Sequence, residues 1–230
     1  MPEPKNRLNK YISEYGNYPR RAADRYISSG TVLVNGQIAK PNTTVAFGDL
    51  VTVEGKPVLP PVPESRLVFA YHKTKNEDAE QAHDLVRAVG RTDSFLSGLT
   101  LYTNDWQLAG NILRPVTGAT KEFLLELNKL PDRKLLNQIE EICALREAKE
   151  GKQKVSLTHI SGNRLKLVLE RELHRQVRKV ITESGFEISN FERLRIFNID
   201  LDDLSAGSWR QLSSSETDTL YELSATKGHP

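Results

Sequence analysis

The stretch from Gly90 to Asp105 reads GRTDSFLSGLTLYTND and places charged side chains directly before an apolar, β-prone run. Arg91 and Asp93 are two positions apart, so both side chains could point into one cleft from an extended backbone. A carboxylate that precedes a buried strand is aimed by a rigid element, where it can act as a nucleophile or a base. Taken alone, these residue types favour a simpler interpretation, a solvated ion pair in an exposed turn, because surface pairs of this kind contribute little.

The same stretch resembles the signature G-R-L-D-x-x-T-x-G-L-L-L-L-T-N-D-G of the RsuA-like family of ribosomal RNA pseudouridine synthases. The matching residues are Gly90, Arg91, Asp93, Gly98, Leu99, Leu101, Thr103, Asn104 and Asp105, and the departures are Thr92, Leu96, Thr100, Tyr102 and Trp106. In that family the Asp of this turn is the essential catalytic carboxylate, so the resemblance assigns this role to Asp93. It also implies that Arg91 fills the space which the target base leaves in the RNA stack.

Pseudouridine formation detaches uracil from its ribose, rotates the base and reattaches it through a ring carbon. The base must first leave its stack in the RNA, which costs a few kcal/mol. A carboxylate must then attack or take a proton in a closed pocket, where desolvation raises its pKa unless a cation is paired with it. The chemistry therefore needs a cation beside the carboxylate and a flat side chain beside the flipped base, and it needs no cofactor and no metal ion.

A helix predicted over Leu173–Ser184 supplies the candidate cations, since its apolar residues recur at helical spacing on one face. At about 100° per residue, Arg178 falls at the border of that face and Arg175 falls nearly opposite it. These positions make Arg178 the better candidate to reach inward and leave Arg175 to face solvent or RNA. The run L-H-R-Q-V-R-K resembles the family's L-N-R-Q-I-R-R segment, with His174 in place of Asn. The second Arg of that segment faces the catalytic Asp in related synthases, so the resemblance also pairs Arg178 with Asp93. The alternative is a basic, solvated helix.

Two further segments carry candidates from the resemblance. Lys121–Leu127, KEFLLEL, alternates like a half-buried strand and resembles the family's K-x-Y-x-V strand, with Phe123 where the family has Tyr. In the family that aromatic packs on the target base, whereas the residue pattern alone allows Phe123 to be a core residue. After a predicted strand at Leu67–His72 the family has a K-P-x-G loop. This chain has Lys73, a candidate RNA contact, and then the polar run 76–82 in a segment that looks shortened.

Basic side chains also gather near the N-terminus, where apolar spacing predicts two short helices within residues 7–28. These basic residues are Arg7, Lys10, Arg20, Arg21 and Arg25. Their side chains could form a solvated helix face, or they could contact phosphates. The Asn35-Gly36 pair between short β-prone runs predicts a hairpin. The order helix, R-R-x-A-D-R helix, G-x-V-x-V-N-G and G-D-x-V-x-V resembles the S-four-type (alpha-L) RNA-binding domain over nearly all of residues 6–56. This resemblance implies that the basic side chains bind RNA.

The chain has 230 residues and an ordinary apolar and charged content, which allows one or two domains with a sizeable core. The stiff, Pro-rich run Val58–Pro63, VLPPVP, marks a boundary between them. We therefore expect an RNA-binding domain over 1–60, a Pro-rich linker over 61–66 and a pseudouridine synthase domain over 67–230. The expected fold class is α+β, with a small alpha-L domain followed by a mixed, mostly antiparallel sheet flanked by helices.

Composition narrows the remaining possibilities. A single Cys excludes an internal disulfide and a Cys cluster for zinc, and no apolar run is long enough to span a bilayer. We expect a cytoplasmic monomer without a membrane partner, and without a metal site among its scattered His residues. Its expected partner is structured RNA, above all the 23S rRNA of the large ribosomal subunit, and transfer RNA as a further possibility. A non-catalytic RNA-binding or ribosome-assembly protein on a degenerate synthase scaffold is the alternative.

Overall fold

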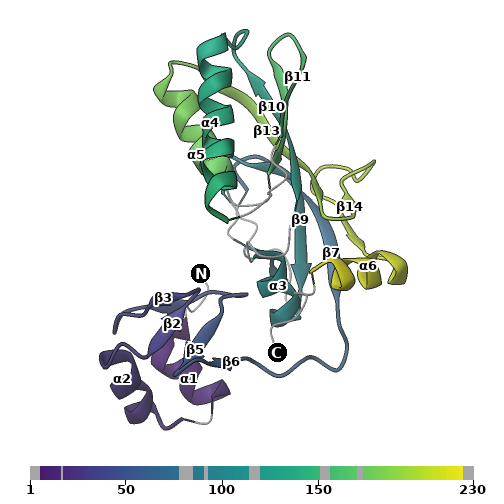
Figure 1. Cartoon of the computed structure of the whole chain (residues 1–230). Helices are drawn as coiled ribbons and strands as arrows, with labels where there is room; N and C mark the ends of the chain where they lie inside the picture. Colours follow the sequence, from purple (N-terminus) through teal and green to yellow (C-terminus); the bar gives the residue numbers. More distant parts are fainter. Residues whose placement is uncertain are drawn as a thin grey trace.

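The structure is a computed structural model that describes residues 6–16, 18–77, 85–90, 93–113, 120–150, 156–169 and 173–224, with the side chains of the 133–150 helix described through Ile142. Its described strands form a small sheet near the N-terminus, a two-stranded ribbon beside it and one large sheet. Figure 1 shows the small sheet and its helices at one end of the molecule, with the large sheet extending away from them. Arg91 lies outside the described residues.

The N-terminal domain is built from two amphipathic helices packed on short strands, α1 (Leu8–Tyr15), α2 (Arg20–Ser28), β2 (Val32–Val34), β3 (Gln37–Ile38), β5 (Val51–Val53) and β6 (Lys56–Val58). The strand order is β3-β2-β5-β6, and the ribbon pairs β1 (Asn6–Arg7) with β4 (Thr44–Val45). The β2–β3 turn has positive φ at both Asn35 and Gly36, as the tightest hairpin turns require. The apolar stripes of both helices bury Tyr11, Ile12 and Ile27 against the sheet.

The large sheet has the order β11-β12-β10-β13-β9-β7-β15, with β14 added to β13 and β8 added to β9. Its strands are β7 (Val68–Lys73), β8 (Arg87–Ala88), β9 (Ser97–Thr103), β10 (Lys121–Leu127), β11 (Ser156–Ser161), β12 (Arg164–Leu169), β13 (Ile188–Ile196), β14 (Ile199–Asp200) and β15 (Trp209–Gln211). Only the β9–β13 pair runs parallel among the described strand pairs. The predicted α+β class with a mixed, mostly antiparallel sheet is therefore confirmed.

The parallel pair in the centre of the sheet depends on Gly98. This residue has a φ of +90°, and a Cβ there would lie 2.4 Å from the carbonyl oxygen of Arg193 on β13. The buried Arg193 side chain reinforces the crossing, since its Nε donates to the carbonyl of Leu99 at 2.6 Å. No residue with a side chain fits this close approach without moving a strand. The crossing therefore fixes the start of β9 and the turn at Asp93 just before it.

Four helices cover the sheet, α3 (Trp106–Leu113), α4 (Arg133–Glu150), α5 (His174–Glu183) and α6 (Ser214–Ser224). The helices α3 and α6 share a core with β7, β9 and β14, while α4 and α5 share another with β10, β12 and β13. Figure 1 places α4 and α5 at the end of the sheet remote from the N-terminal domain, and α3 close to that domain. None of these helices, as far as the described residues go, is long and apolar enough to cross a membrane.

The two parts of the chain touch through Trp106, the residue that stands where the family signature has Gly. Its Nε1 donates to the carbonyl of Asp49 at 3.1 Å, and its ring centroid lies 5.3 Å from that of Tyr11 and 5.1 Å from that of Phe47. On the same side, a Cβ at Gly48 would meet the backbone of α3 at 3.3 Å. The first turn of α3 is therefore a docking surface for the N-terminal domain.

Candidate active site

Asp93 lies in a tight turn before β9, with its carbonyl accepting the N–H of Leu96 at 3.1 Å. Its side chain is 21% exposed and meets the first turn of α5. Arg175 forms a two-point ion pair with it, Nε to Oδ2 at 2.8 Å and Nη2 to Oδ1 at 2.9 Å. His174 Nε2 lies 3.0 Å from Oδ2. The site is thus a carboxylate held by the two consecutive residues that open a helix.

The ionisation of this carboxylate is set by opposing effects. Burial raises the pKa of Asp93, but the hydrogen bonds from Arg175 and His174 outweigh it and hold the pKa below its ordinary value. Both donors favour the charged form because an ionised carboxylate only accepts hydrogen bonds. The side chain is therefore a carboxylate at neutral pH, ready to act as a nucleophile or a base.

The predicted pairing of Arg178 with Asp93 is wrong in this structure, because Arg175 makes that contact. The Arg178 guanidinium lies instead over the ring of Phe95, with Cζ 4.0 Å from the ring centroid. The helical wheel favoured Arg178 for this contact because it compares directions around the helix axis and gives no position along that axis. Asp93 meets α5 at its first turn and at its rim, where Arg175 is 46% exposed, so the residue nearest the helix start reaches it.

Phe123 is fully buried on β10 and belongs to the core that α5 covers. Its ring centroid lies 5.8 Å from that of His174, with 30° between the planes, and 5.5 Å from that of Phe191. The core interpretation describes its present position. A base could stack on Phe123 only after a neighbouring side chain had moved, so the base-stacking role stays a prediction.

Lys73 does not face RNA, contrary to the expectation. It is the last residue of β7, is 2% exposed, and pairs in register with Gly98 of β9. Its Nζ donates to the carbonyl of Leu96 at 2.7 Å and to that of Thr74 at 3.0 Å. Lys73 thus holds the turn that carries Asp93, because the register of β7 directs its ammonium into the protein under that turn.

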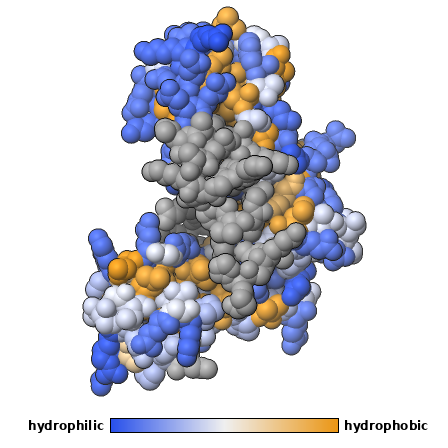
Figure 2. All heavy atoms as spheres, viewed as in Figure 1, coloured by the Kyte–Doolittle hydropathy of each residue, from blue (hydrophilic) through white to orange (hydrophobic). Residues whose placement is uncertain are grey.

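The other predicted RNA contacts lie where RNA could reach them. Arg7, Lys10, Arg20, Arg21 and Arg25 are all exposed, the last three on α2 with Ala23 and Ile27 facing the core. Figure 2 shows hydrophilic side chains over α4 and α5 at the opposite end of the molecule. The phosphate contacts of the five basic side chains near the N-terminus stay predictions. Arg91, another predicted RNA contact, lies outside the described residues.

His174 is the site residue to which the sequence assigned no role. The only signal was its place in the L-H-R-Q-V-R-K run, where it replaces an Asn directly before Arg175. Both Asn and His can donate a hydrogen bond, which marks the position as a donor rather than as a metal ligand. In the part of the chain that the structure describes, no group of three or more His, Cys, Asp or Glu side chains could hold a metal ion.

Comparisons with known proteins identify the family and agree with the fold. The S4 domain family matches residues 6–51. The Dual-specificity RNA pseudouridine synthase RluF of Escherichia coli (strain K12) is 33% identical over 236 residues, covering 97% of this chain and 81% of that protein. The Ribosomal large subunit pseudouridine synthase B of Bacillus subtilis (strain 168) is 27% identical, covering 94% and 96%. A crystal structure of a pseudouridylate synthase superposes with a TM-score of 0.60 at 23% identity, covering 94% of this chain and 99% of that one, and shares the fold.

Proposed function

Since the chain belongs to the RsuA-like family of RNA pseudouridine synthases, we propose that it isomerises a specific uridine in structured ribosomal RNA, with Asp93 as the reacting carboxylate. One observation carries the assignment of the site: Arg175 grips the Asp93 carboxylate at two points, in the turn where the family signature has its catalytic Asp. The comparisons support this synthase interpretation and not the non-catalytic scaffold.

The chemistry fits the geometry of the site. The bond from ribose C1′ to uracil N1 breaks, a bond from C1′ to C5 forms, C5 loses its proton and N1 gains one, so substrate and product are isomers. Asp93 enters this sequence ionised, because its hydrogen bonds lower its pKa. Arg175 is the counter-charge that lets the carboxylate stay ionised when RNA closes the site and excludes water. Our candidates for holding the base and filling its vacated stack are Arg178, which lies over Phe95, Phe123, whose ring lies beside His174, and Arg91, two positions before Asp93 in the sequence.

The N-terminal domain would supply most of the affinity for RNA. Exposed arginines and lysines release counterions from phosphates, which favours binding without reading a sequence. The basic side chains of α1 and α2 are placed for this, and Trp106 ties their domain to α3, the helix that follows β9. The RNA-binding face is therefore held at a set position relative to Asp93, which suits a structured target better than a free single strand.

The finer assignments follow from the same chemistry. A relative named for the large ribosomal subunit favours 23S rRNA as the target. One relative is named a dual-specificity RNA pseudouridine synthase, and we propose transfer RNA, the further partner expected from the sequence, as the second substrate to test. We propose a monomer, because Asp93, Arg175 and His174 come from one chain, and a cytoplasmic location, because ribosomal RNA is the substrate.

The decisive experiment measures label released from C5 of uridine. Purified protein is incubated with tritiated 23S rRNA, with intact subunits and with a transfer RNA pool. We expect release from a ribosomal substrate by the wild-type protein and none by Asp93→Asn, whose amide is close in shape but is neither a nucleophile nor a base. Equal release by Asp93→Asn would refute the role of Asp93, and no release by the wild type from any substrate would refute the synthase proposal.

A further inference from the structure

Of the two described residues that contact the Asp93 carboxylate, Arg175 has a role in the proposed function and His174 has none so far. We propose that His174 is a positioning residue that occupies Oδ2 of Asp93, so that Oδ1 is the oxygen which meets the nucleotide. This inference rests on the proposed function and adds to it a specific donor and a specific reacting atom.

The hydrogen bonds on the two oxygens are unequal. Oδ2 accepts from Arg175 Nε at 2.8 Å and lies 3.0 Å from His174 Nε2, whereas among the described residues Oδ1 accepts only from Arg175 Nη2, at 2.9 Å. Each carboxylate oxygen has two lone-pair positions in its plane. Both positions on Oδ2 are therefore filled by described residues, and one position on Oδ1 is left for the substrate. Without His174 the two oxygens would each accept one bond from Arg175 and would be equivalent.

The surroundings of His174 fix which way its ring points. Its side chain is 1% exposed. Three aromatic rings surround the imidazole, with centroids 6.3 Å away for Phe95, 5.8 Å for Phe123 and 6.5 Å for Phe191. Because Asp93 is ionised and only accepts, Nε2 must carry the hydrogen in this contact. A buried ring that is clamped in this way is a more rigid donor than a long surface side chain would be.

The charged groups near this contact are few among the described residues. Asp93 and Arg175 face the imidazole from the turn and from α5, and the Lys73 ammonium lies under the turn at the carbonyl of Leu96. The packed neighbours from β10 and β13 are the uncharged rings of Phe123 and Phe191. A change in the acid limb of the reaction after substitution of His174 would therefore report on Asp93.

The test compares a variant that keeps the ring shape with one that keeps the donor. His174→Phe retains a flat ring against Phe123 but has no N–H, while His174→Gln places an amide nitrogen at about the same reach as Nε2. The measurements are single-turnover label release as a function of pH and a carbon-detected NMR titration of the Asp93 carboxyl, assigned by its loss in Asp93→Asn. His159→Asn, an exposed His on β11, is the matched control.

We expect His174→Phe to move the acid limb and the Asp93 titration upward by about one pH unit, because one hydrogen bond to the charged form is lost. Its rate above that limb should fall by roughly 10- to 100-fold, because the carboxylate is no longer held in one orientation. His174→Gln should stay close to wild type in both measurements. If His174→Phe does not fold, His174→Leu replaces it as the variant without a donor.

A folded His174→Phe or His174→Leu protein with the wild-type pH profile and rate would overturn the inference and leave His174 as a packing residue. Loss of activity in both the Phe and the Gln variants, with an unchanged Asp93 titration, would overturn it as well, because the donor would then not be the cause. An inactive wild-type protein would instead refute the proposed function itself, so the two failures are distinguishable.

Discussion

Two aspartates in the stretch 90–105 are held in opposite ways, and the difference separates the carboxylate that we propose to react from one that stabilises the fold. Asp105 has a 3% exposed side chain and caps α3, with Oδ1 accepting the N–H groups of Gln107 at 2.9 Å and Leu108 at 3.1 Å. Its Oδ2 accepts the hydroxyl of Tyr221 at 2.7 Å and lies 3.6 Å from Arg66 Nε. Every side of this carboxylate is taken by groups of the fold.

Among the described residues, only side chains hold the Asp93 carboxylate, and one position on Oδ1 stays unfilled by them. The Asp93 side chain is also seven times as exposed as that of Asp105, 21% against 3%. Backbone amides at a helix start cannot move without unwinding the helix, whereas side chains can adjust when a substrate arrives. A carboxylate in the first setting stabilises the fold, and one in the second can react. The signature that contains both therefore combines a reactive end with an anchoring end.

The largest effect that this comparison predicts is that substitution of Asp93 impairs activity, whereas substitution of Asp105 impairs stability. Asp93→Asn should lower activity by roughly 10³-fold or more while the free energy of unfolding changes little. Asp105→Ala should lower the free energy of unfolding by roughly 2 to 3 kcal/mol, because it removes the helix cap and leaves the Tyr221 hydroxyl without its acceptor. Label release and urea unfolding of both variants measure the two quantities.

The folded fraction of Asp105→Ala should keep its activity, measured at a temperature well below its unfolding midpoint. A variant that unfolds normally but has lost turnover would place Asp105 in the reaction and end the distinction between the two aspartates. Likewise, an Asp93→Asn protein destabilised as strongly as Asp105→Ala would show that Asp93 is an anchor.

The second prediction separates the two arginines of α5. Arg175→Ala removes both charge-assisted hydrogen bonds of the guanidinium, so burial of Asp93 prevails and the Asp93 pKa rises. Activity should be lost at neutral pH and partly recovered at higher pH, where Asp93 ionises again. Arg178→Ala loses a stacking contact on Phe95 and should give a smaller defect with an unchanged acid limb.

The same pair of variants also tests how the stability of the protein depends on pH through Asp93. The folded pKa of Asp93 lies below its ordinary value, so its contribution to stability is present above that ordinary value and is lost as pH falls through the folded pKa. In Arg175→Ala this part of the acid dependence should disappear from urea unfolding, while in Arg178→Ala it should persist. The reverse result would restore the pairing of Arg178 with Asp93 that the resemblance implied.

The sequence predicted the frame of this site better than its contacts. Asn35-Gly36 predicted its hairpin because that turn needs local chemistry alone, and the helix predicted over Leu173–Ser184 is α5, His174–Glu183. The resemblance located Asp93 and the helix opposite it. It could not predict which turn of α5 Asp93 contacts. That position depends on the close approach of β9 to β13 at Gly98 and on Arg175, about eighty residues from Asp93 in the chain.

Lys73 and Phe123 show a second limit. An alternating or β-prone run indicates which residues share a face, but whether that face meets RNA or protein depends on what packs over it. Lys73 lies beneath the Asp93 turn because β7 pairs with β9 in one register, and Phe123 is buried because α5 packs against the core that contains it. Both positions depend on contacts with segments far away in the chain, so a sequence motif can identify such residues but cannot say what they contact.

The third prediction tests the anchoring end alone. Burial, and then the hydrogen bond to the Asp105 carboxylate, raise the pKa of Tyr221 well above its ordinary value, so the hydroxyl is a donor at all working pH values. Tyr221→Phe should lower the free energy of unfolding by about 1 kcal/mol and leave label release unchanged. A drop in activity without a drop in stability would mean that α6 supports the reaction through a route other than Asp105.

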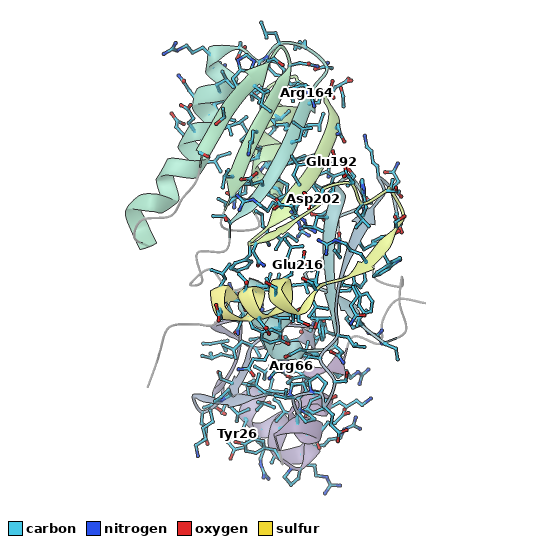
Figure 3. The ribbon with its side chains drawn as sticks, turned by 90° about the vertical axis from the view of Figure 1, so that its right-hand side faces the viewer. Tyr26, Arg66, Arg164, Glu192, Asp202 and Glu216 are labelled. Carbon is cyan, nitrogen blue, oxygen red and sulfur yellow. The ribbon has the colours of Figure 1, made fainter. Side chains whose placement is uncertain are left out.

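The smallest effect should come from Arg66, the counterpart of Arg175 at the anchoring end. The two side chains are similarly exposed, 51% and 46%, and each stands beside an aspartate. Arg175 makes two bonds of 2.8 and 2.9 Å to its carboxylate. Arg66 stays 3.6 Å away and lies over the ring of Tyr221, 4.7 Å from its centroid, next to α6 in Figure 3.

Because the Asp105 carboxylate already accepts three hydrogen bonds from the fold, Arg66 adds only a screened surface attraction to it. Arg66→Gln should change the free energy of unfolding by about 0 to 1 kcal/mol in low salt and by less at about 1 M salt, with activity unchanged. Urea unfolding at both salt concentrations, beside Arg175→Gln, measures this. Equal losses of activity in Arg66→Gln and Arg175→Gln would mean that proximity of an arginine to an aspartate is enough. The two hydrogen bonds from Arg175 to Asp93 would then not explain its effect on activity.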